Sequence, residues 1–339
     1  MKNHQRSLQM KKKRIKSHLE KINLFAAGID IGSHSHYVAV PEDLDTESVK
    51  EFASFTGELN KMADWLVSIG ILTVAMESTG IYWIPAYEIL AERGITVLLV
   101  NAHHIKNVSG RKSDVMDCQW IQQLHTYGLL NGAFRPEEET VALRSYMRQR
   151  ETLTQQASDY IRRMQKALRQ MNLLLDNVVS DIDGVTGMKI IRAILDGERN
   201  PETLAKLRDG RCKKDEKTIA ASLEGHYQEV HLFSLKQSLE LYDTYQEKII
   251  DCDVEIQKHL QYMLPEIDKQ IELPDLDNVR RSKKSKNCPT FDVRGELYQL
   301  TGVDLTAIDG LEENSVLKIL SETGVDMSYW PTEKQFCSW

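Results

Sequence analysis

The sequence has few of the features that mark membrane, secreted or zinc-binding proteins. No run of about eighteen apolar residues occurs in the 339-residue chain, so no segment is long enough to cross a bilayer as a helix. The five cysteines are scattered, without a CxxC pair or a Cys/His cluster, which argues against a disulfide framework or a zinc site. The apolar stretch 24–29 follows a basic N-terminus but is short and runs directly into Asp30, unlike a signal peptide. We therefore expect a cytoplasmic protein with reduced thiols and no membrane partner.

An excess of positive charge, which generic nucleic-acid binders usually have, is also missing. The 43 Lys and Arg residues and 50 Asp and Glu residues give a formal net charge of −7. Residues 1–21, however, hold eight Lys or Arg residues and a single acid, so the overall charge does not exclude a polyanionic partner. This tail is either solvated or a phosphate contact. Its candidate contacts are Lys11, Lys12, Lys13 and Arg14.

The chain has enough apolar residues, 41%, to form real cores, and its length favours two or three domains. Short apolar runs alternate with helical patterns between about residues 24 and 135. The expected strands are 25–31, 37–40, 49–55, 71–76 and 95–100, and the expected helices are 59–69, 81–92 and 114–130. Three hairpin-like strands followed by alternating helices and strands predict an α/β domain with a mixed sheet.

Beyond Pro136, apolar residues recur at alternating steps of three and four. A first register covers 143–178 and is interrupted at Arg150; a second covers 232–263 and has polar Gln246 and Asp253 at seam positions. These registers predict a coiled-coil region, either an antiparallel helical hairpin or a dimerising stalk. Two ordinary bundle helices remain the alternative.

A proline-containing stretch with a run of basic residues at 280–286 follows, and then further helical segments. The predicted organisation is a basic tail (1–23), an α/β domain (24–137), a helical coiled-coil region (138–264), a basic linker (265–294) and a further helical domain (295–339).

Two carboxylates stand where a charge is costly. Asp30 lies within an apolar strand pattern, where an unpaired carboxylate loses its hydration. Glu77 ends another strand pattern and precedes the small-residue turn 78–80. A carboxylate at a strand end is well placed in the cleft of an α/β domain, although a capping role explains Glu77 equally well.

Two further acids, Asp114 and Asp117, are spaced to share one helix face. Acids at a helix start also simply satisfy the helix dipole. Together with Asp30 and Glu77, however, they can converge from two strands and a following helix. Such a cluster repels itself unless divalent cations neutralise it, and oxygen ligands suit Mg²⁺ or Mn²⁺. Metal ions held in this way support phosphodiester chemistry.

Three segments that carry these acids, 28–32, 77–80 and 111–117, resemble the DEDD transposase family of bacterial insertion sequences. The resemblance implies a RuvC-like, RNase H-like N-terminal domain, then a coiled coil and a C-terminal transposase domain. By motif match it assigns the catalytic and metal-binding roles to Asp30, Glu77, Asp114 and Asp117. It also implies a structured bridge RNA that pairs with donor and target DNA, and a homo-oligomer, a dimer or tetramer, formed through the coiled coil.

Segments 300–311 and 321–331 are similar to the opening of the family's C-terminal domain. The family's catalytic serine lies beyond the segment similar to 336–339, so the resemblance implies a C-terminally truncated chain without that serine. Ser338 is not the matching residue.

The first long helical pattern is strongly basic, with seven Lys or Arg residues and two acids between 144 and 169. Such a helix could follow the backbone of a duplex or a folded RNA, and a solvated charged face is the alternative. The candidate nucleic-acid contacts are Arg162, Arg163, Lys166 and Arg169.

We therefore expect an insertion-sequence transposase or recombinase that is directed by RNA and cuts and exchanges DNA strands with Mg²⁺ or Mn²⁺. One alternative is a RuvC-like, structure-selective nuclease in which the same acids activate water. The other is a catalytically inert nucleic-acid-binding remnant.

Overall fold

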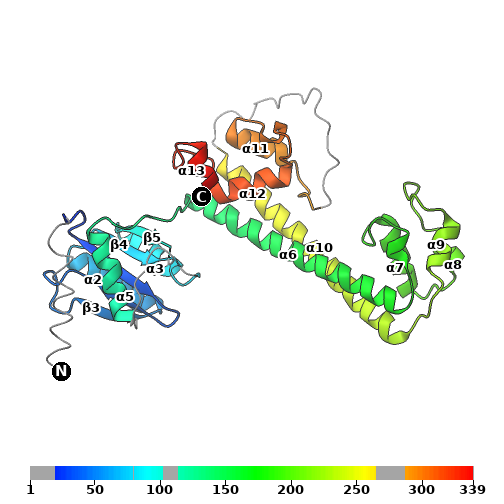
Figure 1. Cartoon of the computed structure of the whole chain (residues 1–339), viewed down its shortest axis with the longest axis horizontal. Helices are drawn as coiled ribbons and strands as arrows, with labels where there is room; N and C mark the ends of the chain where they lie inside the picture. The colour runs from blue at the N-terminus through cyan, green and yellow to red at the C-terminus, as the bar shows by residue number, and fades with distance from the viewer. Residues whose placement is uncertain (1–19, 79, 102–113, 265–286, 339) are drawn as a thin grey trace. The chain divides into compact units, whose positions relative to one another are not determined.

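The computed structural model describes residues 20–78, 80–101, 114–264 and 287–338. The chain divides between Arg135 and Pro136 into two compact units, and each is described by itself (Figure 1). Within the described ranges, none of the helices combines the length and the apolar character needed to cross a membrane.

The first unit is built on a mixed sheet that has five strands among the described residues. They are β1 (Ala26–Ile31), β2 (Ser35–Ala39), β3 (Val49–Ala53), β4 (Thr73–Glu77) and β5 (Thr96–Val100), in the order β3-β2-β1-β4-β5. The first three strands are antiparallel to one another, whereas β4 and β5 join β1 in parallel. The predicted α/β class with a mixed sheet is confirmed, and every strand overlaps its predicted range.

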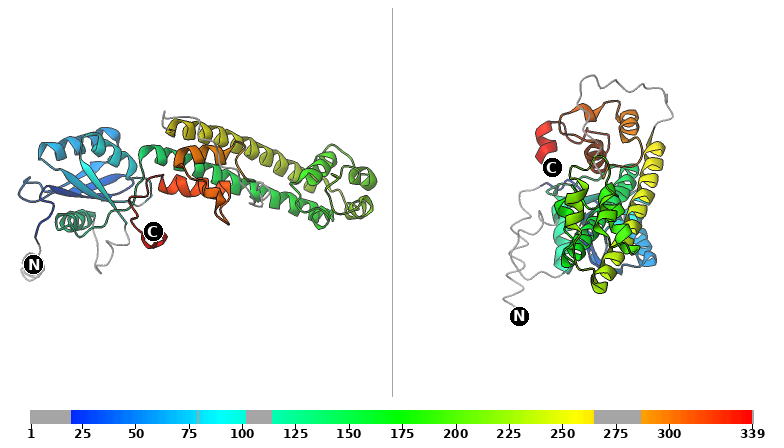
Figure 2. Two further views of the ribbon diagram at one scale, coloured as in Figure 1. Left: turned by 90° about the horizontal axis from the view of Figure 1, so that it is seen from above. Right: turned by 90° about the vertical axis from the view of Figure 1, so that its right-hand side faces the viewer.

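Helices cover both faces of this sheet. They are α2 (Thr56–Ser68), α3 (Ile84–Glu92) and α5 (Asp114–Thr126). Ile29 and Met76 belong to the larger core, which includes Leu59 of α2 and Leu90 of α3. A smaller cluster joins Ala75 and Val100 to Ile121 of α5, and Figure 2 shows α5 on the opposite face from α2 and α3. Side chains along a strand point alternately to the two faces of the sheet. Alternate residues of β4 therefore pack against different helices.

The second unit contains two long helices, α6 (Glu138–Gln170) and α10 (Glu229–Met263), which lie side by side (Figures 1 and 2). They are antiparallel. His259 near the end of α10 contacts the Glu139 carbonyl at the start of α6, with 2.6 Å between nitrogen and oxygen, and Tyr160 stacks on Tyr245 further along. The two predicted registers therefore form an antiparallel helical pair, while coiled-coil packing stays a prediction.

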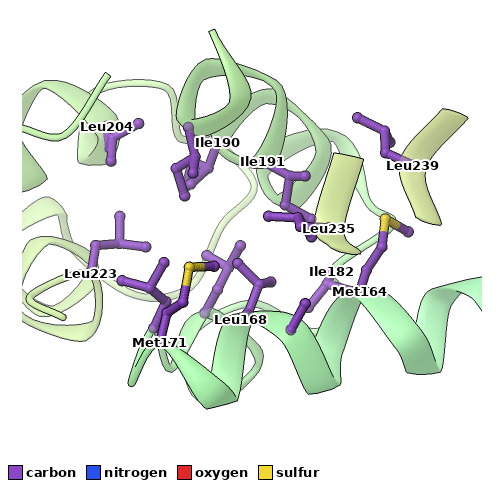
Figure 3. Packing of buried hydrophobic residues seen from close by; sticks show 14 of the residues in the cluster. Met164, Leu168, Met171, Ile182, Ile190, Ile191, Leu204, Leu223, Leu235 and Leu239 are labelled. Atoms are coloured by element: carbon purple, nitrogen blue, oxygen red, sulfur yellow. The ribbon is translucent and has the colours of Figure 1, made fainter. Parts of the chain in front are cut away.

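A group of short helices joins the far ends of α6 and α10. These are η1 (Leu175–Asn177), α7 (Val185–Leu195), α8 (Pro201–Ala205) and α9 (Glu216–Ser222). Figure 3 shows how Leu168 of α6, Leu235 of α10 and Ile190 of α7 meet in one apolar core. The short helices cover the apolar faces of α6 and α10 at this end of the pair. Each long helix has an apolar stripe that must pack against another element.

Two of the three polar interruptions in the registers, Arg150 and Asp253, are partners. Nε of Arg150 donates to Oδ1 of Asp253 at 2.5 Å, and both side chains are at most 5% exposed. Arg150 also donates through Nη2 to the Asn287 carbonyl at 2.9 Å, and Oδ2 of Asp253 accepts from the Thr290 amide at 3.0 Å. A buried charge needs such pairing, and here the pair also fastens the segment from residue 287 onward to the long helices.

That C-terminal segment contains α11 (Val293–Thr301), η2 (Leu305–Ala307), α12 (Glu313–Thr323) and α13 (Glu333–Ser338). Leu297 and Leu317 pack in one cluster with Leu143 of α6 and Ile256 of α10. The segment thus shares a core with the base of the helical pair. Most of the expected linker, 265–286, lies outside the described residues, and the assignment of 295–339 to a separate domain stays a prediction.

Candidate functional site

Asp30 and Glu77 come together through strand register. In the parallel pair β1–β4, Ile29 is opposite Met76, so the next position on each strand is Asp30 and Glu77. Neighbouring strands lie about 4.8 Å apart, and the alternation of side chains puts both carboxylates on the same face of the sheet. It is the face that carries Ala75, the face covered by α5.

The direction of α5 brings its first turn to the same end of the sheet. Oγ1 of Thr73, at the start of β4, lies 2.9 Å from Nε2 of His125, at the end of α5. The Thr126 carbonyl accepts from the amides of Ile22 and Asn23, just before β1. The helix therefore runs antiparallel to β1 and β4. Its N-terminal turn, which contains positions 114 and 117, lies toward the strand ends that carry Asp30 and Glu77.

Gly28 allows α5 to approach this face closely. A Cβ atom at residue 28 would lie 2.2 Å from the Gln122 amide nitrogen and 2.5 Å from the Cys118 carbonyl oxygen, both in the backbone of α5. Any side chain would have to displace the helix. The glycine two residues before Asp30 thus determines how near the helix comes to the sheet.

The pKa of the buried Cys118 thiol is affected by the acids near it. Burial raises the pKa of Cys118 to about 12, with the negative charge of Asp30 the next contribution and that of Asp117 a smaller one. The thiol donates to the Val115 carbonyl at 3.2 Å. Asp30 and Asp117 therefore lie within electrostatic reach of one group. Cys118 itself stays protonated and is no nucleophile at neutral pH.

The donor chemistry of these acids suits a divalent cation, because carboxylate oxygens are the ligands that Mg²⁺ and Mn²⁺ prefer. The backbone of Asp114 begins α5, but its side chain lies outside what the structure describes. Among the side chains that are described, no three from His, Cys, Asp and Glu are grouped closely enough to hold one ion. The fold thus brings Asp30, Glu77 and Asp117 to one end of one face without assembling a ligand set.

Tyr37 is a neighbour of this site that the sequence reasoning missed. In the antiparallel pair β1–β2 it is directly opposite Asp30, so Asp30 lies between Tyr37 on one side and Glu77 on the other. The sequence signal was the short turn after Gly32. This turn pairs Ile31 with His36, so in an antiparallel hairpin residue 30 lies opposite residue 37.

The basic candidates on α6 are all exposed, but not all carry a free charge. Arg162 pairs with Asp159, and Nε of Arg169 lies 2.8 Å from Oδ2 of Asp176. The guanidinium of Arg163 lies 4.9 Å from the centre of the Tyr160 ring. Acidic partners thus offset two of the four cations. The fourth candidate is Lys166, and the tail candidates Lys11, Lys12, Lys13 and Arg14 lie outside the described residues.

A transposase family model, that of the DEDD transposases of the IS110 type, matches residues 27–173, which include α5, α6 and all of the sheet except Ala26. No curated protein matches the chain. The matched range contains all four acids of the predicted site and the glycine that lets α5 approach them. Residues 27–173 of this chain are therefore similar to the transposase domain of the DEDD family.

Proposed function

We propose that the chain is a metal-dependent DNA transposase whose cutting site is the end of the sheet that α5 covers, in a RuvC-like domain. The observation that carries the proposal is the register of β1 and β4, which makes Asp30 and Glu77 neighbours on that face. The antiparallel course of α5 adds Asp117 and the backbone position of Asp114 at the same end. A transposase of this family acts on DNA, so the natural substrate of such an acidic face is a phosphodiester.

The four acids would hold Mg²⁺ or Mn²⁺, which supplies charge neutralisation at the phosphate and stabilises the departing oxygen. The chain's own contribution is placement. Asp30 lies on β1, the central strand, and Glu77 lies on the adjacent β4, so hydrogen bonds on both sides fix the two backbones. Asp117 is held by the helix that packs against Gly28. Rigid backbone positions of this kind limit how far the carboxylates must move to bind one ion.

We further propose that a structured guide RNA directs the cut to donor and target DNA, as the family resemblance implies. The exposed cations of α6 support a contact with an RNA backbone, since A-form RNA is recognised by shape and phosphate. Copies of the chain would associate through the α6–α10 pair as a dimer or tetramer.

The test of the cutting site uses the chain joined to the serine-containing C-terminal segment that the family resemblance implies, purified with its bound RNA, and a supercoiled plasmid that carries the ends of the insertion sequence. We expect Mg²⁺-dependent nicking that EDTA abolishes. Asp30→Asn and Glu77→Gln should each lower the rate by about 100-fold or more, the effect typical of losing a group that stabilises transition-state charge. Glu88→Gln changes an exposed acid of α3 in the same unit and serves as the matched control. Nicking at the normal rate by Asp30→Asn would overturn the proposal.

The guide-RNA proposal has its own readout. RNA extracted from the purified chain should be enriched in one transcript encoded beside the gene, and ribonuclease treatment should abolish cutting at the insertion ends. If the ribonuclease-treated chain instead cuts branched DNA of any sequence, it is a structure-selective nuclease and the RNA-guided assignment is wrong.

A further inference from the structure

We propose that the turn after Glu77 is a nucleobase contact, in which the ring of Tyr82 stacks on an unpaired base beside the cut phosphodiester and Ile81 packs against that base. The inference rests on the proposed function for the position of the cut. Ile81 and Tyr82 belong neither to the four acids nor to the basic helix α6.

The starting observation is an exposed apolar pair. Ile81 is 71% exposed and Tyr82 is 52% exposed, and the two are consecutive. Single exposed apolar residues need no explanation, but an isoleucine and a tyrosine presented together on one short turn form a surface of the kind that binds a partner.

The turn is held firmly from beneath. Nε1 of Trp83 donates to the Gly80 carbonyl at 3.1 Å, and the Trp83 ring meets the Tyr87 ring edge-on at 5.8 Å. The guanidinium of Arg135 lies 4.1 Å from the centre of the Tyr87 ring. Gly80 has a φ of +64°, which a residue with a side chain rarely adopts, and it sets the direction of the chain into the turn. The exposure of Ile81 and Tyr82 is therefore built into the local fold.

The turn also begins at the strand end that carries the acids. The Ser78 amide and hydroxyl both donate to the Val100 carbonyl, at 3.0 and 3.2 Å, which fixes the residue after Glu77 to the end of β5. From Glu77 to Tyr82 the chain can reach at most about 18 Å, since an extended residue spans about 3.3–3.6 Å. That distance corresponds to about five base-pair steps of 3.4 Å. A base on Tyr82 is thus within a few nucleotides of a phosphodiester at Glu77.

The chemistry of the turn favours a base over a phosphate. Ile81, Tyr82 and Trp83 carry no charge, and the nearby guanidinium of Arg135 lies over the rings of Tyr87 and Trp83, at 4.1 and 5.9 Å from their centres. An aromatic ring with an aliphatic neighbour instead offers a face on which any base can stack. Paired bases inside a duplex do not present that face, so the expected ligand is DNA that is locally unpaired near the cut.

The experiment uses the full chain and a DNA duplex whose central bases are unpaired and include 2-aminopurine, with Ca²⁺ in place of Mg²⁺ to prevent cutting. We expect the protein to quench the fluorescence of one or two positions. Tyr82→Ala should abolish this quenching and weaken binding to the bubble DNA about 10-fold or more, while Tyr82→Phe and Tyr82→Trp retain it. Binding to fully paired DNA should change less than about 2-fold. The matched control is Tyr262→Ala, which removes a tyrosine that is 74% exposed on α10.

Two further outcomes separate this inference from the proposed cutting site. If Asp30→Asn loses cutting and keeps the Tyr82-dependent quenching, both proposals stand. If Asp30→Asn still cuts but the quenching depends on Tyr82, the cutting site is wrong and the base contact stands. Normal quenching by a Tyr82→Ala protein overturns the base contact. Circular dichroism shows whether the Tyr82→Ala protein is folded. If it is unfolded, the test rests on Tyr82→Phe and Tyr82→Trp. Loss of quenching by these two variants, when both are folded, also overturns the base contact.

Discussion

The buried ion pair between Arg150 and Asp253 allows a sharp test of what holds the second unit together. Both side chains are nearly inaccessible, and each has a further backbone partner in the C-terminal segment, the Asn287 carbonyl for the arginine and the Thr290 amide for the aspartate. In Asp253→Ala the guanidinium stays buried without its carboxylate, and the Thr290 amide loses its acceptor.

The expected cost follows from these two losses. Removing one partner of a buried ion pair costs about 3–5 kcal/mol, because the remaining charge is left without compensation. An unsatisfied buried amide adds about 1 kcal/mol or more. With a urea m-value of about 2–3 kcal/mol per molar, the midpoint of unfolding of the second unit should fall by about 1.3–3 M.

The assay is urea unfolding followed by the helical circular dichroism signal, combined with hydrogen exchange at Thr290, whose amide should lose its protection. Asp159→Ala is the control, since it breaks the exposed pair with Arg162 on the same helix and should cost less than about 1 kcal/mol. The reasoning is refuted if Asp253→Ala destabilises no more than Asp159→Ala, or if the Thr290 amide exchanges at an unchanged rate.

Three further predictions concern the first unit. Gly28→Ala places a Cβ atom 2.2 Å from the Gln122 nitrogen, so it should displace α5, lower the melting temperature by several degrees and reduce DNA cutting; a normal melting curve would contradict this. Hydrogen bonds from an amide, an indole and an ammonium group lower the pKa of Asp45 to about 2. Its stabilising contribution is therefore complete above about pH 4 and lost as the pH falls toward 2, so the stability difference between the native chain and Asp45→Asn should vanish over that range in acid titrations of the melting temperature. Finally, because burial raises the pKa of Cys118 to about 12, iodoacetamide at pH 8 should label the exposed Cys337 well before Cys118 in a mass-spectrometric time course, and equal rates would disprove the packing.

Much of the first unit could be predicted from the sequence because its signals are local. Apolar runs or partial alternation, bounded by turn residues, predicted the strands, since a buried strand is continuously apolar, a half-buried strand alternates, and a turn needs small or polar residues. The helix α3 begins at Ile84, three residues later than predicted, because the chain first makes the turn that exposes Ile81 and Tyr82. An apolar residue on an exposed turn has the same local pattern as one at a helix start.

The candidate site was predicted only in part. Asp30 and Glu77 stood out because a carboxylate in or beside an apolar strand is unusual. Their adjacency depended on the pairing of β1 with β4, which are more than forty residues apart, and on a register that no local pattern specifies. Tyr37 entered the site for the same reason, by pairing across β1 and β2.

The sequence by itself determined the fold class, the two long helical registers and the identity of the suspect acids, because hydrophobic periodicity and charge are properties of neighbouring residues. Only the tertiary structure decided how distant positions meet. It showed that Arg150 and Asp253, polar interruptions from different registers, form a buried ion pair, and that α5 lies against β1 where Gly28 leaves room. The physical reason is that a buried charge and a missing side chain acquire meaning only from what packs against them, and those partners come from other parts of the chain.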